Sequence, residues 1–223
     1  MRKWFLLFLF LALPAFAQPQ RSEVIRALFK NDGEGFLDPA KNEALQKVLA
    51  TKPKLDIYET AALGTSVALE KMLGDDPEAL NRPNQFGWTL LHLAAYGGNA
   101  PNTELLLRKG AAVNVHAKTK FRNTPLQAAL LTGQYATAKL LLEHGADVLV
   151  RQAQGFTAMH EAALLGRADL VNLLLDHGAE LNSRSDSGRT LLSDALRGKH
   201  EELAAMMRAK GATTEPTPDE EPK

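Results

Sequence analysis

Apolar residues recur along this chain in a pattern that repeats every 33 to 35 positions. Each copy begins with a threonine, continues through a short stretch rich in Leu or Ala, and closes on a glycine at a constant distance from the threonine. The four threonines are Thr89, Thr124, Thr157 and Thr190, and the four glycines are Gly110, Gly145, Gly178 and Gly211. A fixed period in this range predicts an array of stacked structural repeats.

Each copy is predicted to form two short helices. Threonine is a favourable N-cap, and Pro125, directly after Thr124, suits the first helical position. The leucine triplets at 105–107, 140–142 and 173–175 give the second helix an apolar ridge, and the closing glycine can adopt the left-handed conformation that ends a helix. One helix pair cannot bury its leucines alone, so neighbouring copies are expected to stack. The polar segment before the next threonine is predicted to be an extended finger or turn.

The ends of the array are expected to differ from its middle. A weaker fifth copy around Ala61 precedes the other four. Upstream, residues 22–30 predict one helix, and Asp38-Pro39 predicts the start of another that runs to about Ala50. The organisation predicted downstream of a short leader is therefore N-terminal capping helices at 18–54, about five repeats at 55–212, and a disordered acidic, Pro-rich tail at 213–223.

The repeats resemble those of the ankyrin family, whose pattern includes T-P-L-H-x-A. Thr124-Pro125-Leu126 keeps the first three positions, and the pairs Thr89/His92 and Thr157/His160 keep the threonine and the histidine. The resemblance covers about 55–212 and implies an all-α fold, a solenoid of stacked helix pairs with short β-turn fingers. It also implies that the two motif histidines make a structural hydrogen bond to nearby backbone.

The N-terminal segment 1–17 has the layout of a secretory signal peptide. Arg2 and Lys3 precede an apolar run, Pro14 breaks it, and Ala15-Phe16-Ala17 provides a small-residue cleavage site. The run is shorter than the roughly 20 residues that span a bilayer, which argues against a membrane anchor. We expect cleavage after Ala17. An exported chain without cysteine fits the bacterial periplasm, with further secretion left open.

Composition and the absence of catalytic motifs argue against nucleic-acid binding, enzyme activity and metal or cofactor binding. Basic and acidic residues balance at 26 each, which argues against a nucleic-acid partner. There is no cysteine, and the sequence contains no GxSxG, HExxH or phosphate-binding loop. We therefore expect no enzyme activity, no catalytic residue, no metal site and no cofactor.

The resemblance implies that a protein partner is bound by the fingers and by the inner face of the first helices. The matching finger residues are Phe86, Trp88, His116, Lys118, Lys120, Phe121, Arg122, Arg151, Phe156, Arg184 and Arg189, and the outward positions on the inner helices are Tyr96, Leu131 and Leu164. The second finger is two residues longer than the others, and Arg122 stands where they have glycine. The rings could instead pack finger against finger. The basic residues could form a solvated edge or meet an acidic partner surface.

These features predict a periplasmic protein-binding module that sequesters or inhibits one partner and is monomeric when free. The layout is similar to exported bacterial ankyrin proteins of the self-protection type, which implies an immunity-like inhibitor of a peptidoglycan-cleaving envelope peptidase. No membrane association is expected after cleavage of the leader. Two alternatives remain: a stress-protection or chaperone factor with several clients, and a secreted effector that binds host proteins.

Overall fold

The computed structural model describes residues 23–29 and 42–214. The predicted leader and residues 215–223 of the predicted tail lie outside this range, as does the predicted helix start at Asp38-Pro39. The chain divides into two compact units, Met1–Gly145 and Ala146–Lys223, which are described in turn.

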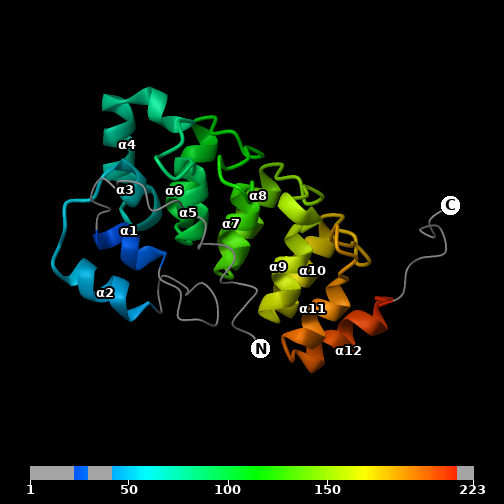
Figure 1. Ribbon diagram of the computed structural model, residues 1–223. Helices are drawn as coiled ribbons and strands as arrows, with labels where there is room; N and C mark the ends of the chain where they lie inside the picture. The colour runs from blue at the N-terminus through cyan, green and yellow to red at the C-terminus, as the bar shows by residue number, and fades with distance from the viewer. Residues whose placement is uncertain (1–22, 30–41, 215–223) are drawn as a thin grey trace. The chain divides into compact units, whose positions relative to one another are not determined.

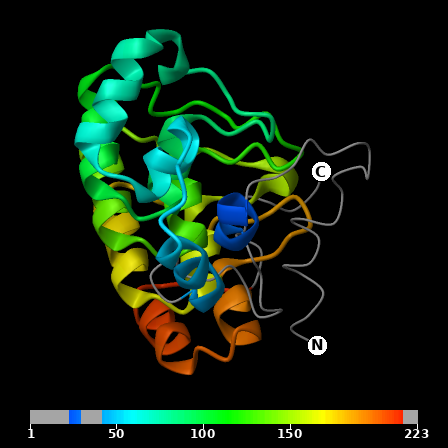
Figure 2. The ribbon, with the colours of Figure 1, turned by 90° about the vertical axis from the view of Figure 1, so that its left-hand side faces the viewer.

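The first unit contains an N-terminal helix pair and three repeat pairs (Figure 1). Its elements are α1 (Glu23–Leu28), α2 (Glu43–Ala50), α3 (Ile57–Leu63), α4 (Ser66–Asp75), the 3-10 helix η4 (Pro77–Leu80), α5 (Leu90–Tyr96), α6 (Ala100–Arg108), α7 (Pro125–Leu131) and α8 (Tyr135–Glu143). The first helices of the repeats pack in the order α3, α5, α7, and the second helices pack in the order α4, α6, α8. Figure 2 shows these two rows as separate layers.

The second unit contains two further repeat pairs. Its elements are the 3-10 segment η5 (Ala153–Gly155), α9 (Ala158–Leu165), α10 (Ala168–Asp176), α11 (Leu191–Arg197) and α12 (Glu201–Ala209). The helix α9 packs against α10 and α11, and α11 packs against α12. The described residues of both units form helices, turns and one isolated bridge between Arg184 and Thr190, so the predicted all-α class is confirmed.

The second N-terminal helix begins later than the sequence suggested. The helix α2 starts at Glu43, because the Asn42 side chain accepts a hydrogen bond from the Leu45 N–H and caps it. The Asn42 amide also donates to the Ala27 carbonyl at 2.6 Å, which ties α2 to α1. The expected start at Asp38-Pro39 was therefore wrong for the helix that continues to Ala50.

A repeat threonine and a motif histidine hold the start of α5 and of α9. The His92 Nδ1 accepts a hydrogen bond from the Thr89 N–H, and the His92 Nε2 lies 2.9 Å from the Asn123 carbonyl of the next repeat. Since Nδ1 accepts, Nε2 carries the proton and donates. The His160 ring makes the same pair of contacts, with Thr157 and the Arg189 carbonyl. The structural role predicted for both histidines is confirmed.

A buried asparagine and a half-buried histidine add links between repeats that the sequence analysis missed. The fully buried Asn102 of α6 donates to the carbonyls of Thr60 and Ala61 at the end of α3. In the second unit, His200 Nε2 lies 3.0 Å from the Leu164 carbonyl at the end of α9. These bonds satisfy carbonyls that a helix end leaves without an intrahelical partner.

Acidification should destabilise the fold through these histidines. Burial lowers the pKa of His92 and of His160 from 6.5 to about 4. Between pH 6.5 and 4, these two histidines are protonated in the unfolded chain but stay neutral in the folded protein. The free energy of unfolding therefore falls as the pH falls through this window. Each histidine should contribute a loss of roughly 2 kcal/mol at pH 5.

The substitution His92→Gln should remove the part of the acid-induced decrease in the free energy of unfolding that is due to His92. Gln127 occupies the equivalent position in the next repeat and accepts the Thr124 N–H at 2.9 Å, so glutamine can replace the capping contact. Urea unfolding at pH 7 and pH 5, followed by circular dichroism, measures the difference. The exposed His177→Gln serves as the control, and an unchanged pH dependence in His92→Gln would contradict the assignment.

Candidate partner-binding fingers

Three of the four fingers are tight turns of one design. The segments 84–88, 152–156 and 185–189 are each closed by a hydrogen bond from the fourth residue's N–H to the first residue's carbonyl. A second bond joins the N–H of the first residue to the carbonyl of the fifth, as in Asn84 N–H to Trp88 O at 2.8 Å. The glycine in the turn, Gly87, Gly155 or Gly188, has a positive φ of 73° to 83°. The expected β-turn fingers are thus present.

The second finger is longer and has its own internal bonds. Its base is closed by Ala117 N–H to Asn123 O at 2.8 Å, so two more residues lie between the paired positions than in the other fingers. The Thr119 hydroxyl accepts the N–H groups of Phe121 and Arg122, and His116 Nδ1 lies 2.8 Å from the Arg122 carbonyl. These bonds give the longer loop a defined conformation.

Backbone contacts hold adjacent fingers of one unit together. In the first unit, Lys118 N–H donates to Gly87 O at 2.7 Å, and a Cβ on Gly87 would lie 2.5 Å from the Lys118 carbonyl oxygen. In the second unit, Asp186 N–H donates to Gln154 O at 2.9 Å. Glycine at position 87 therefore allows the second finger to dock against the first.

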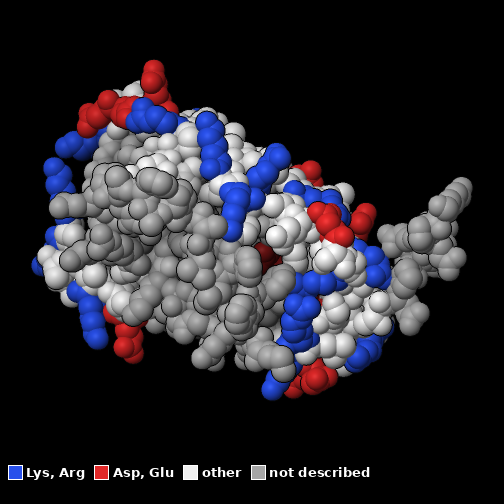
Figure 3. All heavy atoms as spheres, viewed as in Figure 1, with Lys and Arg blue, Asp and Glu red and all other residues white. Residues whose placement is uncertain are grey.

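The basic finger residues fall into two groups by their ion pairs. Lys and Arg side chains project from the visible face in Figure 3. In the second unit, Arg151 pairs with Asp186 at 2.9 Å and also donates to the Arg184 carbonyl. The Arg189 guanidinium, with a side chain 11% exposed, pairs with the buried Asp194. Arg184 donates to the Gly188 carbonyl. These predicted contact residues are engaged within their own unit.

In contrast, the cations of the second finger are exposed and form no ion pair with any described residue. These are Lys118, Lys120 and Arg122. Lys120 lies over the half-buried Phe121 ring, with Nζ 4.9 Å from its centroid. His116 is half-buried beside them. This finger is the part of the predicted surface that keeps unpaired positive charge available to a partner.

The aromatic residues predicted as contacts are mostly used for packing. Tyr96 is fully buried and Trp88 is 8% exposed, because Phe29, directly after α1, packs against both rings at centroid distances of 4.8 and 5.4 Å. Phe156 is 6% exposed, with His160 against its edge and Arg189 over its face. The prediction that Tyr96 faces outward was therefore wrong, and the rings of Trp88 and Phe156 are committed to their own unit.

The outward positions on the inner helices divide in the same way. Leu131 is 4% exposed, because α7 is apolar on every face except at Gln127 and is buried along its whole length. Its predicted outward orientation was wrong. Leu164 of α9 and Phe86 of the first finger are half-buried and keep part of their surface accessible.

The second unit contains a buried pair of acidic residues that was not predicted from the sequence. Glu161 and Asp194 each lie four residues after their repeat threonine, on the packed helices α9 and α11. Burial raises the pKa of Glu161 to about 7 and raises that of Asp194, and the Asp194 charge adds to the shift at Glu161. Gln152 donates to Glu161 at 2.8 Å. The spacing of four could have revealed this pair.

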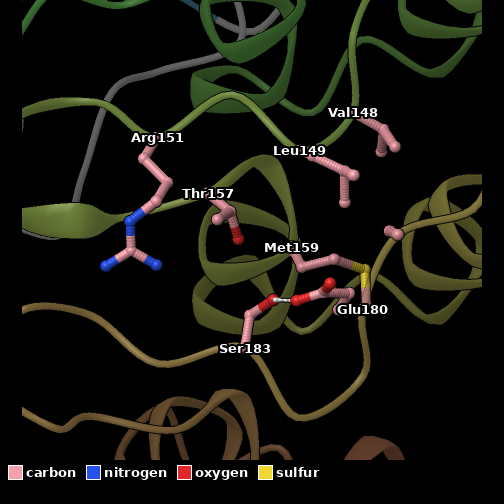
Figure 4. A pocket seen from close by; sticks show the side chains of 8 residues that line it. Val148, Leu149, Arg151, Thr157, Met159, Glu180 and Ser183 are labelled. Atoms are coloured by element: carbon pink, nitrogen blue, oxygen red, sulfur yellow. Dashed lines mark hydrogen bonds between the residues drawn. The ribbon is translucent and has the colours of Figure 1, made fainter.

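The second unit also has a small surface pocket of about 200 Å³ (Figure 4). Val148, Leu149 and Met159 supply its apolar part, and a hydrogen bond from Ser183 to Glu180 lies along one side. The pocket is smaller than the minimum of about 300 Å³ that is usual for ligand sites. Among the described residues no group of acids or histidines could hold a metal ion, and no helix there is long and apolar enough to cross a membrane.

The pocket lies where a link between repeats is missing. Asn81, Asn114 and Asn182 each follow a second helix and bond to the backbone of the following repeat, as in Ala112 N–H to Asn81 Oδ1 at 2.9 Å. Leu149 occupies the corresponding position, four residues after Gly145, and is 49% exposed. A leucine can neither accept nor donate such a bond.

The substitution Leu149→Asn should restore this link and stabilise the second unit. Its side chain could accept the Glu180 N–H and donate to the Gly178 carbonyl, with a net gain of about 1 kcal/mol. Thermal unfolding followed by circular dichroism measures the gain. Leu149→Ala is the matched control, and an equal gain in both variants would argue against a restored hydrogen bond.

The substitution Trp88→Ala should act on stability. Its ring packs against Phe29, His92 and Tyr96, so truncation leaves a cavity and should lower the free energy of unfolding by about 3 to 5 kcal/mol. Phe121→Ala, which removes the half-buried ring of the second finger, should lower the free energy of unfolding by about 1 kcal/mol or less. Urea unfolding of both variants tests the contrast. A Trp88→Ala protein as stable as the unsubstituted chain would contradict this packing role.

Comparison with known proteins agrees with the geometry. The family description "Ankyrin repeats (3 copies)" matches residues 57–152 and 149–217. Ankyrin repeat and SAM domain-containing protein 6 of Rattus norvegicus is 34% identical over 127 residues, which cover 55% of this chain and 14% of that protein. Alpha-latrotoxin-Lg1a of Latrodectus geometricus is 40% identical over 85 residues, covering 37% and 6%.

A plant relative extends the comparison. The probable E3 ubiquitin-protein ligase XBOS31 of Oryza sativa subsp. japonica is 33% identical over 110 residues, covering 48% of this chain and 24% of that protein. The matched segments thus span a quarter or less of the length of these relatives. The shared part is the repeat array, a protein–protein interaction module, and the matching family description indicates no enzyme family. This chain belongs to the ankyrin-repeat family.

Proposed function

We propose that this chain is an exported binding protein that occupies one protein partner and thereby restrains it. The most concrete form is an immunity-like inhibitor of a peptidoglycan-cleaving envelope peptidase. The observation that carries the proposal is the second finger, residues 116–123, which is well defined by internal hydrogen bonds and presents cations that no described residue neutralises. A loop of this kind suits insertion at the edge of a partner's cleft.

The predicted export of the chain is consistent with a protein that acts by covering part of its partner. The layout of the N-terminal segment 1–17 favours delivery to the periplasm. A binding array delivered there acts on its partner by contact. A defined loop loses little conformational entropy when it binds, which favours a tight complex with one partner over weak contact with many. A chaperone-like role is therefore the second candidate.

The proposal is tested by capture from a periplasmic extract. The chain from Gln18 serves as bait, beside a finger variant that carries Lys118→Glu, Lys120→Glu and Arg122→Glu. A control bait carries three charge reversals at exposed sites outside the fingers, Lys71→Glu, Arg208→Glu and Lys210→Glu. Circular dichroism first establishes that all three baits are folded.

One envelope hydrolase retained at 1:1 stoichiometry by the unsubstituted and control baits, and lost with the finger variant, is the expected result. Its activity on purified peptidoglycan should then fall when the unsubstituted chain is added. If many proteins are retained weakly and equally by all baits, the inhibitor proposal is wrong and a stress or chaperone role is favoured. Retention of a cytosolic host protein after addition of host extract would favour a secreted effector.

A further inference from the structure

Arg122 adopts a backbone conformation that its side chain makes unfavourable. Its φ is +57°, in the left-handed region, where the Cβ of an L-residue crowds the backbone. The other three fingers have glycine at this position, with φ values of +83°, +73° and +78° for Gly87, Gly155 and Gly188. Glycine takes this conformation without a steric penalty. At this position the second finger carries backbone strain that the glycines avoid, and the third finger has a non-glycine residue in the left-handed region one position earlier, at Gln154 with φ +68°.

Nothing within the described chain offsets this strain through the arginine side chain. The backbone of Arg122 is fixed, because its N–H donates to Thr119 Oγ1 at 3.2 Å and its carbonyl lies 2.8 Å from His116 Nδ1. Its guanidinium is exposed and makes no hydrogen bond or ion pair with another described residue. Residues held in such regions cluster at active sites, ligand clamps and switch regions.

The positive charge near Arg122 comes from the second finger itself. Residues 105–142 contain no Asp or Glu, in a chain whose net charge is +0. Of the other cations in this stretch, Arg108, Lys109 and Lys139 pair with Glu104, Glu70 and Glu143, whereas Lys118, Lys120 and Arg122 form no ion pair with a described residue. The finger cations of the second unit are engaged there, Arg151 and Arg189 with aspartates and Arg184 with backbone. The positive field of the second finger is therefore left for an outside partner.

We infer that the second finger, residues 116–123, binds a carboxylate cluster on the surface of a protein partner, with Arg122 as its anchoring group. This inference rests on the proposed protein-binding function and adds the chemistry of the partner. A guanidinium presents paired N–H donors that match the two oxygens of one carboxylate, and the two lysines attract further carboxylates as point charges. Fixed backbone geometry directs these groups before the partner arrives.

A protein partner fits this finger better than a nucleic acid. Binding of single-stranded nucleic acid uses exposed aromatic faces on which bases stack. Here the phenyl ring of the finger, Phe121, is half-buried and has Lys120 over its face. A small set of cations on a near-neutral chain suits a local group of carboxylates, whereas a phosphate backbone requires an extended basic track.

The chain offers a matched pair of variants to test this inference. Arg122→Gly removes both the strain and the guanidinium. Lys199→Gly is the control, because Lys199 is exposed, has φ +61°, and stands in a helix–helix turn where other repeats have Gly98, Gly133 or Gly166. Both variants relieve left-handed strain and remove one positive charge, so both should raise the Tm, by about 2 to 4 °C.

Only Arg122→Gly should weaken binding to acidic ligands. The whole chain, expressed with its own leader and purified, is titrated by calorimetry and NMR with a synthetic peptide of six Glu-Ala repeats, and with a single-stranded oligonucleotide of equal charge. We expect about tenfold weaker peptide binding for Arg122→Gly, none of this loss for Lys199→Gly, and amide shifts confined to 116–123. Binding should weaken as salt is added.

Three results would overturn the inference: no peptide binding by the unsubstituted chain, equal binding by Arg122→Gly, or tighter binding of the oligonucleotide. Its failure is distinguishable from that of the proposed function by the capture experiment. If the unsubstituted and Arg122→Gly baits retain an envelope partner equally, the proposed function is supported and the role of the second finger is excluded. If the peptide binds at the finger but no partner is captured, the proposed function fails and the binding of carboxylates by the finger is supported.

Discussion

The structure depends on the fact that its helices are too short to be stable alone. The first helices of the repeats have seven or eight residues, and the second helices have nine or ten. Isolated helices of this length are marginal in water. Their stability comes from packing α3 on α5 and α5 on α7 in the first unit, and α9 on α11 in the second. Each repeat is thus folded only because its neighbour is.

This dependence explains why so many polar residues are buried at the joints between repeats. Tight packing of short helices leaves many helix-end carbonyls and N–H groups out of reach of water, and each needs a partner. His92 and Asn102 supply these partners by reaching from one repeat to the next. Asn81, Asn114 and Asn182 make similar links between repeats at more exposed positions. The same contacts between repeats also position the second finger, because His92 binds the Asn123 carbonyl at its base.

The sequence was sufficient for the features that depend on local chemistry. Thr89, Thr157 and their histidines were recognised correctly, because an N-cap and its partner three residues later act within one turn. Trp88 and Tyr96 were misjudged because their exposure depends on Phe29, a residue distant in the sequence that no repeat pattern connects to them. Periodicity predicts which face of a helix points inward, but it does not predict a helix from outside the array that covers that face.

The same distinction applies to charge. Arg122 and Arg189 are both basic residues close to a repeat threonine, but Arg122 aligns with Gly188 and Arg189 aligns with Asn123. Arg189 lies beside Asp194, an acid placed on the inner helix of its own repeat, and is drawn into the fold at 11% exposure. The second repeat has Ala128 at the position of that acid, so nothing there draws an arginine inward. A finger cation is therefore drawn into the fold where an acid or a carbonyl of its own unit lies within reach, as Asp194 does for Arg189 and Asp186 for Arg151. The longest finger has no such acid among the described residues, so its cations remain exposed.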